Sequence, residues 1–309
     1  MLSRLAESLY WIGRYVERAE DTARILDVHL QLLLEDRRVD ESAACRALLD
    51  VMGIQELEDR EPDASLVVAL LAADPENRGS IVGSLRAARS NARGARDAIS
   101  SEMWESLNTT YHTLPDLAKL VGIGPHALFR FVKERTAMVS GLADSSMVRD
   151  DGWHFLVLGR SLERIDMTAR LLSARYGEIW GPTGWVTMLR CCAAHEAYLS
   201  THQRAVDGSL AADFLLLDRL FPRSIYHALC TAEAALIELD PTTARSGSFS
   251  NDARRILGRA RTQLEFHTSA ELLADLPVLL RDIQRAAATT GNAVGERYFR
   301  QTRALVWQA

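Results

Sequence analysis

The chain has 309 residues, of which 48% are hydrophobic and 25% charged, a balance typical of folded globular proteins rather than disordered ones. Aromatic residues make up 7%, and the 8 Pro and 18 Gly are too few turn residues for a β-sandwich. The net charge of −5 argues against the concentrated basic surface that nucleic-acid binding needs. The composition therefore predicts an all-α protein that does not bind nucleic acid.

Charged residues interrupt the first twenty positions, and no stretch of about 18 apolar residues follows. We therefore expect no membrane span, no membrane partner and a cytoplasmic location. The chain has 4 cysteines without the spacing of a disulfide framework, and Cys191 and Cys192 are adjacent, which is a poor arrangement for a bridge. This pattern predicts reduced thiols.

Helical periodicity dominates from the beginning of the chain. Apolar residues alternate at spacings of four and three from Leu5 to Leu33, which predicts a helix over residues 3–37 that packs along other long helices. Most prolines fall at breaks in the pattern, and no strand alternation is found. Further helices are predicted over residues 41–51, 65–73, 80–113, 126–143, 152–176, 183–206, 209–220, 224–239, 251–269, 270–289 and 293–306.

The first helix is repeated later in the chain. Residues 12–26 and 158–172 share Gly, Arg, Glu, Arg, Thr, Ala, Arg and Leu at the same spacing. Residues 74–85 and 218–229 also correspond, and Ser80 and Ser224 both have the position of a helix N-cap. We predict one all-helical domain over 1–309, a single large bundle built from duplicated halves, about 1–145 and 146–309. Pseudo-two-fold symmetry would place the duplicated helices near its axis.

Each copy of the repeated helix carries a polar stripe at spacings of four, three and four. The stripes are Gly13, Glu17, Glu20 and Arg24, and Gly159, Glu163, Asp166 and Arg170, with Arg14, Arg18, Arg160 and Arg164 on the adjoining faces. Glycine inside a helix costs about 1 kcal/mol relative to alanine, so the matched glycines indicate close approach of a backbone or ligand. Two interpretations stay open. In the first, the charges form exposed intrahelical pairs, Arg14 with Glu17 and Glu20 with Arg24. In the second, the stripes meet across the axis in a partly buried network, with or without a ligand.

Residues 91–108 form a second dense polar segment, expected on one helix. Its candidate binding residues are Asn91, Arg93, Arg96, Glu102 and Glu105. Pairs of acidic residues three positions apart occur in this segment and in both stripes, and they resemble the carboxylate ligands of a di-metal helical bundle. Such bundles also need a Glu-x-x-His motif, which is absent, and arginines lie next to every acidic pair. Cys191 and His195, one predicted turn apart, have no second pair of zinc ligands. The sequence therefore predicts neither a metal nor a cofactor.

Several motifs together resemble one known family. The stretches YVERAEDTAR and SLERIDMTAR, the run NARGARDAISSEMWESLN and the segment FPRSI are similar to those of the alpha-E family, a bacterial all-helical domain named for its Glu-Arg motif. The likeness covers essentially the whole chain. The motif maps onto Glu17, Arg18, Glu163 and Arg164. The resemblance implies partnership with an ATP-grasp-type amide ligase and a transglutaminase-like peptidase, and it implies no catalytic role for these residues.

We therefore expect a non-catalytic helical accessory subunit that acts with those partners in peptide or amide-bond synthesis and holds a peptide ligand. The alternatives are an enzyme or metal-binding bundle that uses clustered Glu and Arg, with Glu17, Glu102 or Glu163 as general base or metal ligand, and a purely structural scaffold. The candidate binding residues are Arg14, Glu17, Arg18, Glu20, Arg24, Asn91, Arg93, Arg96, Glu102, Glu105, Arg160, Glu163, Arg164, Asp166 and Arg170.

Overall fold

The computed structural model describes residues 1–54, 61–118, 124–176, 184–240 and 252–299. Within these ranges the chain is helical, and no strand is found. The longer helices are α1 (Ser3–Glu35), α5 (Ser101–Ala118), α6 (Pro125–Ser146), α7 (Asp151–Tyr176), α11 (Ile225–Leu239), α12 (Asp252–Phe266) and α14 (Leu276–Val294). The shorter ones are α2 (Glu41–Val51), α3 (Ala64–Val68), α4 (Ile81–Gly94), α8 (Gly184–Cys191), α9 (His195–His202), α10 (Gly208–Leu217) and α13 (Ser269–Ala274), with π segments η1 (Ala69–Ala73) and η3 (Gly295–Phe299) and the 3-10 turn η2 (Arg96–Ala98).

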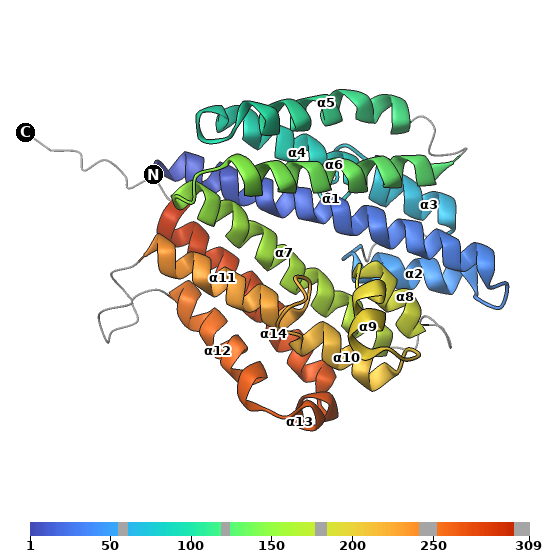
Figure 1. Ribbon diagram of the computed structural model, residues 1–309. Helices are drawn as coiled ribbons and strands as arrows, with labels where there is room; N and C mark the ends of the chain where they lie inside the picture. The colour runs from blue at the N-terminus through green and yellow to red at the C-terminus, as the bar shows by residue number, and fades with distance from the viewer. Residues whose placement is uncertain (55–60, 119–123, 177–183, 241–251, 300–309) are drawn as a thin grey trace, which may run out of the picture.

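Helices α1 and α7 form the centre of the bundle, and the other helices pack around them (Figure 1). Helix α1 packs against α4, α6 and α7, whereas α7 also packs against α11 and α14. Helix α5 lies outside α4 and α6, and α12 lies outside α11 and α14. The predicted all-helical bundle is thus confirmed, and the long first helix forms its central rod.

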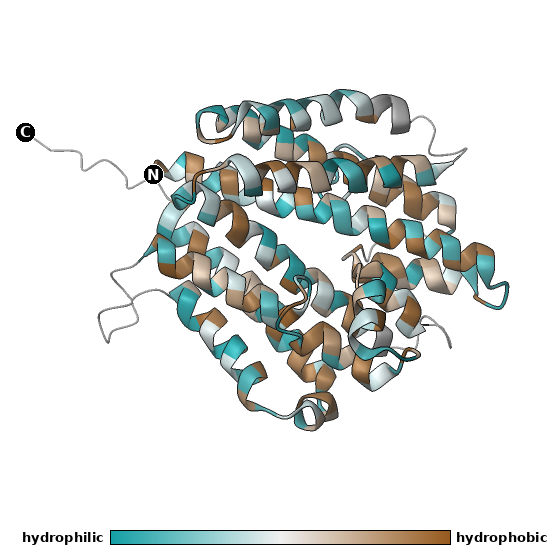
Figure 2. Ribbon diagram, in the orientation of Figure 1, coloured by the Kyte–Doolittle hydropathy of each residue, from teal (hydrophilic) through white to brown (hydrophobic). Residues whose placement is uncertain are grey.

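The buried apolar side chains form one contiguous core that reaches from α1 to α14. Figure 2 shows hydrophobic residues on the sides of helices that face one another, and hydrophilic residues on the outward sides. Hydrophilic positions also interrupt α1 and α7 where the two helices lie together. No helix in the described part of the chain is long and apolar enough to cross a membrane.

Two glycines set the distance between the central helices. A Cβ atom added to Gly13 would lie 2.1 Å from the carbonyl oxygen of Leu156, and one added to Gly159 would lie 2.1 Å from that of Tyr10. Real side chains cannot approach so closely, so only glycine permits this backbone contact. The prediction that the matched glycines mark a close backbone approach is confirmed.

The serine N-caps are also confirmed. The Ser80 hydroxyl accepts the Gly83 N–H at 2.9 Å, and the Ser224 hydroxyl accepts the His227 N–H at 3.1 Å. Each cap fixes the first turn of a helix, α4 or α11, that packs on a central helix.

The single helix predicted over residues 80–113 is wrong. Helix α4 ends at Gly94, the turn η2 follows, and α5 begins at Ser101. A glycine interrupts the helical pattern, and the Ser100 hydroxyl accepts the Met103 N–H at 3.2 Å, which starts a new helix. Helix α5 then continues past Pro115 to Ala118, although proline has no backbone N–H to donate to the preceding turn.

Three other predicted helices are also interrupted. The helix over 183–206 is wrong because α8 ends at Cys191 and Ala193 adopts a left-handed φ of 53° before α9 begins. The helix over 65–73 closes as the π segment η1, and that over 270–289 divides at Asp275. Most of the helix predicted over 293–306 lies outside the described residues, and its described part includes η3.

Candidate functional site

The two central helices are joined by reciprocal ion pairs. Arg18 of α1 donates to Glu163 of α7 through Nε at 2.6 Å and Nη2 at 3.0 Å. Arg164 of α7 donates to Glu17 of α1 through Nε at 2.6 Å and Nη2 at 3.1 Å. Glu17 is 1% exposed and Glu163 is 2% exposed. Each carboxylate is therefore removed from water and held by a bidentate guanidinium.

This geometry follows from the repeated sequence. Both helices carry Glu followed by Arg, and the helices run side by side in the same direction with the two motifs at one level. The acid of each helix consequently meets the arginine of the other. The interpretation of Arg14 and Glu17 as an intrahelical pair is wrong, because Arg14 Nε lies 2.7 Å from Glu163 Oε2. The charged stripes meet between the helices, as the buried-network interpretation predicted.

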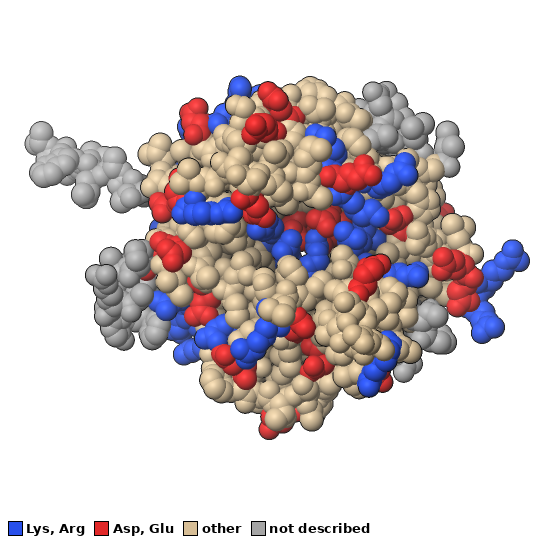
Figure 3. All heavy atoms as spheres, in the orientation of Figure 1, with Lys and Arg blue, Asp and Glu red and all other residues tan. Residues whose placement is uncertain are grey.

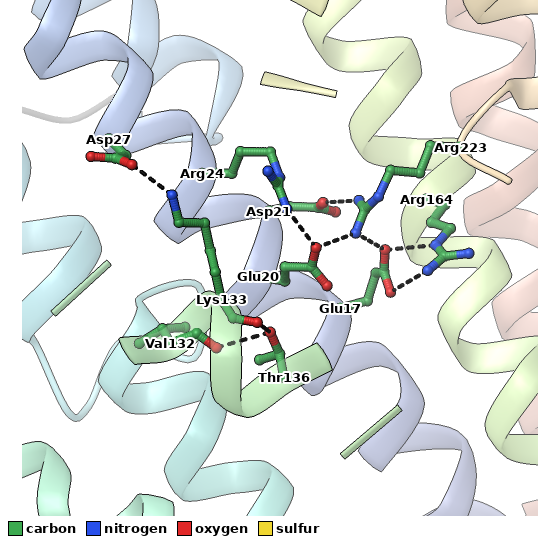
Figure 4. Close-up of polar contacts among 10 residues, drawn as sticks. All are labelled: Glu17, Glu20, Asp21, Arg24, Asp27, Val132, Lys133, Thr136, Arg164 and Arg223. Atoms are coloured by element: carbon green, nitrogen blue, oxygen red, sulfur yellow. Dashed lines mark hydrogen bonds and ion pairs between the residues drawn. The ribbon is translucent and has the colours of Figure 1, made fainter. Parts of the chain in front are cut away.

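Arg223 is a second arginine in contact with Glu17, beside Arg164 (Figure 4). Its Nη2 lies 2.9 Å from Glu17 Oε1 and 2.7 Å from Glu20 Oε1, and its Nη1 donates to Asp21 Oδ1 at 2.5 Å. The residue directly precedes Ser224, the N-cap of α11, so the cap positions its backbone. One guanidinium thus contacts three carboxylates of α1.

The sequence prediction missed Arg223 and Asp21. Arg223 lies in the FPRSI segment that carries the family resemblance, and Gly79 occupies the corresponding position in the earlier segment. This difference between otherwise matched segments was the available signal. Asp21 follows Glu20 directly but lies outside the periodic stripe, which is why it was not selected.

The outer parts of the stripes form pairs within each helix. Arg24 lies 2.9 Å from Glu20, and Arg170 lies 2.8 Å from Asp166. The predicted i,i+4 pair of Glu20 with Arg24 is confirmed, and Asp166 with Arg170 repeats it on α7. Arg160 lies near the end of α6, 3.5 Å from Asp144.

Helix α6 is attached to α1 by a smaller charged cluster. Lys133 Nζ and His126 Nδ1 each lie 2.6 Å from an oxygen of Asp27 (the lysine contact is drawn in Figure 4). These side chains are more exposed than the central pairs, so the cluster lies toward the edge of the network.

The arginines keep the central glutamates ionised. Burial would raise the pKa of Glu17, but the charges of Arg223 and Arg164 outweigh burial and hold it below its ordinary value. Burial acts on Glu163 in the same way, and Arg14 leads the opposing charges that lower its pKa. Neither glutamate is suited to take up a proton near neutral pH.

Asp21 is electrostatically different from its neighbours. Burial raises its pKa to about 7, and the charges of Glu17 and Glu20 add to this effect against the opposing charge of Arg223. Its second oxygen, Oδ2, is buried without a hydrogen bond in the described structure. Asp21 is therefore a carboxylate of this network whose charge changes near neutral pH, and burial also raises the pKa of Asp166.

Figure 3 shows a hollow in the middle of one face, between α6 and α11 as labelled in Figure 1, with acidic and basic side chains around it. Helices α1 and α7 pass behind this opening. The side chains of Arg24, Arg164 and Arg223 retain 23%, 19% and 11% exposure. These arginine side chains are thus partly accessible to water, whereas Glu17 is enclosed.

The candidates of residues 91–108 do not join this network. Asn91 donates to the Ala87 carbonyl at 2.9 Å, and Arg96 lies over the Trp104 ring at 4.9 Å. The others, Arg93, Glu102 and Glu105, are exposed on α4 and α5. The prediction that this segment forms one polar helix is wrong because the chain turns between α4 and α5.

In the described ranges, no group of three or more His, Cys, Asp or Glu side chains has a geometry that could hold a metal ion. Cys191 and His195, considered as a zinc pair, lie on different helices, and Cys191 is buried. Burial raises the pKa values of the Cys191 and Cys192 thiols, so both stay protonated.

The fold and the site define a class of protein: an all-helical bundle whose two central helices exchange Glu–Arg ion pairs. The chain belongs to the Alpha-E family, described as a predicted alpha-helical domain with a conserved ER motif, which it matches over residues 1–299. The dipeptides Glu17–Arg18 and Glu163–Arg164 supply the reciprocal pairs.

The chain is 26% identical to uncharacterized proteins of Mycobacterium bovis and Mycobacterium tuberculosis. Each match covers 94% of this chain and 37% of the relative, so the chain spans little more than a third of their length. No solved structure matches the chain significantly.

Proposed function

We propose that the chain is a non-catalytic accessory subunit that acts with an ATP-grasp-type amide ligase and a transglutaminase-like peptidase in peptide or amide-bond synthesis. Its central arginines would hold an anionic or zwitterionic group of the peptide, and the subunit would work in the cytoplasm. The partners come from the family resemblance. The observation that carries the non-catalytic role is the bidentate pairing of Glu17 and Glu163, which keeps both carboxylates ionised.

The length of the mycobacterial relatives supports an accessory role. In those proteins the matching region is 37% of a longer chain, so a domain of this kind is joined to other sequence there. The accessory role requires contact between this domain and its partners, whether the parts lie in one chain or in separate chains.

We also propose that residues 1–145 and 146–309 arose by duplication and retain pseudo-two-fold symmetry. Three matched features support this: the exchanged Glu–Arg pairs, the reciprocal contacts of Gly13 and Gly159, and the serine caps of α4 and α11. Arg223 breaks the correspondence, because its counterpart is Gly79. The Glu17 side of the network is thereby distinguished from the Glu163 side, and we assign ligand binding to it.

Asp21 favours a second candidate, an enzyme that uses clustered Glu and Arg. A carboxylate with a pKa of about 7 beside a guanidinium has the properties of a general acid or base. A purely structural scaffold would instead need neither ligand nor proton transfer.

One set of experiments separates these functions. The purified chain is mixed with an ATP-grasp-type ligase from the same organism, and co-elution and ATP turnover are measured with and without the chain. The accessory role predicts a complex and a changed turnover rate, and absence of both rejects it. Amide hydrolysis by the chain alone that is lost in Asp21→Asn would establish the enzyme instead.

A further inference from the structure

A groove on α1 has features that none of the functions above uses. It has a volume of about 720 Å³ and lies between α1, α14 and η3. From α1 it is lined by Glu7, Tyr10, Trp11 and Arg14. These positions recur at spacings of three and four, so they share one face of the helix.

Small residues of α14 and of the first position of η3 form the opposite wall of the groove. Ala288, Gly291 and Gly295 line it at successive turns. Gly295 has an ordinary helical φ of −59°, so no unusual backbone conformation requires glycine there. A Cβ at this position would meet the Phe299 ring at an ordinary 3.7 Å. At Gly291, by contrast, a Cβ would lie 3.2 Å from the Tyr10 hydroxyl oxygen, so close packing on α1 favours a small residue at that turn of the wall.

Arg14 brings unused hydrogen-bonding capacity to one end of the groove. Its Nη1 donates to the Tyr10 hydroxyl at 3.3 Å, while its buried Nε lies 2.7 Å from Glu163 without an aligned hydrogen bond in the described structure. A guanidinium carries five N–H donors. Arg18 and Arg164, by contrast, each direct two donors to a glutamate. Arg14 is therefore the central arginine best placed to receive a carboxylate from the groove.

The other end of the groove is acidic. Glu7 lies two helical turns before Arg14 and is exposed, and the rise of an α-helix places it about 10 Å away along the axis. Tyr10 and Trp11 lie between the two charges, with their rings 5.5 Å apart in an edge-to-face arrangement. An extended peptide of three residues also spans about 10 Å.

We propose that this groove binds a short peptide of about three residues with both ends free. Its carboxylate would meet Arg14, its ammonium group would meet Glu7, and an apolar middle side chain would pack on Trp11. The inference deepens the proposed function, on which it rests, by naming the peptide class and a second binding region beside the central network.

The test is calorimetric titration of the whole chain with the tripeptide Ala-Phe-Ala, its C-terminal amide and its N-acetyl form. We expect the free tripeptide to bind and the amide to bind about tenfold more weakly, since a hydrogen bond to a charged group is lost. Acetylation should weaken binding about two- to fivefold, because Glu7 is exposed to water. Absence of binding, or equal affinity for the free peptide and its amide, would overturn the proposal.

Two variants keep the test specific to the groove. Ala288→Phe should fill the groove and abolish binding, whereas Thr289→Phe, on the neighbouring exposed position that does not line it, should leave binding unchanged. Glu7→Gln should remove the preference for the free amino end. Equal binding by both phenylalanine variants would place the peptide elsewhere. No ligase is present in these titrations, so a failure to bind the ligase and a failure to bind the peptide are separate results.

Discussion

The Arg18 guanidinium of α1 holds both carboxylate oxygens of Glu163 of α7, a residue that is 2% exposed. A buried carboxylate that loses its partner retains the cost of its desolvation, so the effect of a substitution depends on which member of the pair is removed. We expect Arg18→Gln to destabilise the fold by about 3 kcal/mol, which is the lower limit for breaking a buried ion pair. The lower limit applies because Arg14 also lies near Glu163 and still compensates part of its charge.

The same pair can be tested by a double-mutant cycle in urea denaturation. Combining Arg18→Gln with Glu163→Gln should cost less than the sum of the single changes, because the neutral side chain of Glu163→Gln no longer leaves a buried carboxylate without its bidentate partner. Arg14 loses its ion pair with Glu163 equally in the Glu163→Gln single variant and in the double variant, so this loss cancels in the cycle. Strictly additive losses would show that the two side chains do not interact in solution.

The glycine contact gives a prediction with an internal control. Gly13→Ala and Gly159→Ala should each destabilise by about 1–3 kcal/mol, since the new methyl group would meet a backbone carbonyl at 2.1 Å and force the helices apart. Gly141→Ala on α6, where nothing lies within 4 Å of the added atom, should stabilise by about 0.5–1 kcal/mol through helix propensity. Thermal unfolding distinguishes these signs, and a stabilising Gly13→Ala would contradict the observed packing.

Asp21 predicts an unusual pH dependence. Its folded pKa of about 7 lies above its ordinary value of 3.8, so the folded state binds this proton more tightly than the unfolded state. The stabilising contribution is complete below pH 3.8 and is lost as the pH rises toward 7. Glu17 and Glu163, whose pKa values are lowered, contribute in the opposite direction and lose stability as the pH falls through their folded values.

The Asp21 contribution can be isolated with Asp21→Asn, which resembles the protonated acid. Urea denaturation at pH 5 and pH 8 should show the native chain losing stability relative to the variant as the pH rises. A constant difference between the two proteins would mean that Asp21 titrates with an ordinary pKa in the folded state.

The sequence predicts the parts of this structure that depend on local spacing. The heptad pattern of α1, the serine caps and the matched glycines are each encoded within a few residues, and all are found. The meeting of the stripes was also predictable, because a repeated Glu-Arg dipeptide on two long helices favours exchange between them.

The rest depends on contacts that spacing does not encode. Arg223 reaches Asp21 across 202 residues of sequence from a loop, and no helical period connects the two. The sequence did not predict the break after Gly94, because apolar periodicity continues on both sides of it. In the structure the chain turns there, and Arg96 packs on the Trp104 ring instead of continuing a polar helix. These are tertiary effects that override local propensity.

The final prediction compares a central cation with a peripheral one. Arg223→Met should destabilise by about 3 kcal/mol or more, since Glu20 and Asp21 lose a buried partner and Glu17 keeps only Arg164 among its close contacts. Lys133→Met removes a pair of similar length, 2.6 Å to Asp27, but Asp27 is less buried and His126 also contacts it. We expect that change to cost at most about 1 kcal/mol. Equal losses in urea denaturation would show that distance, rather than burial and the number of carboxylates held, determines the strength of these pairs.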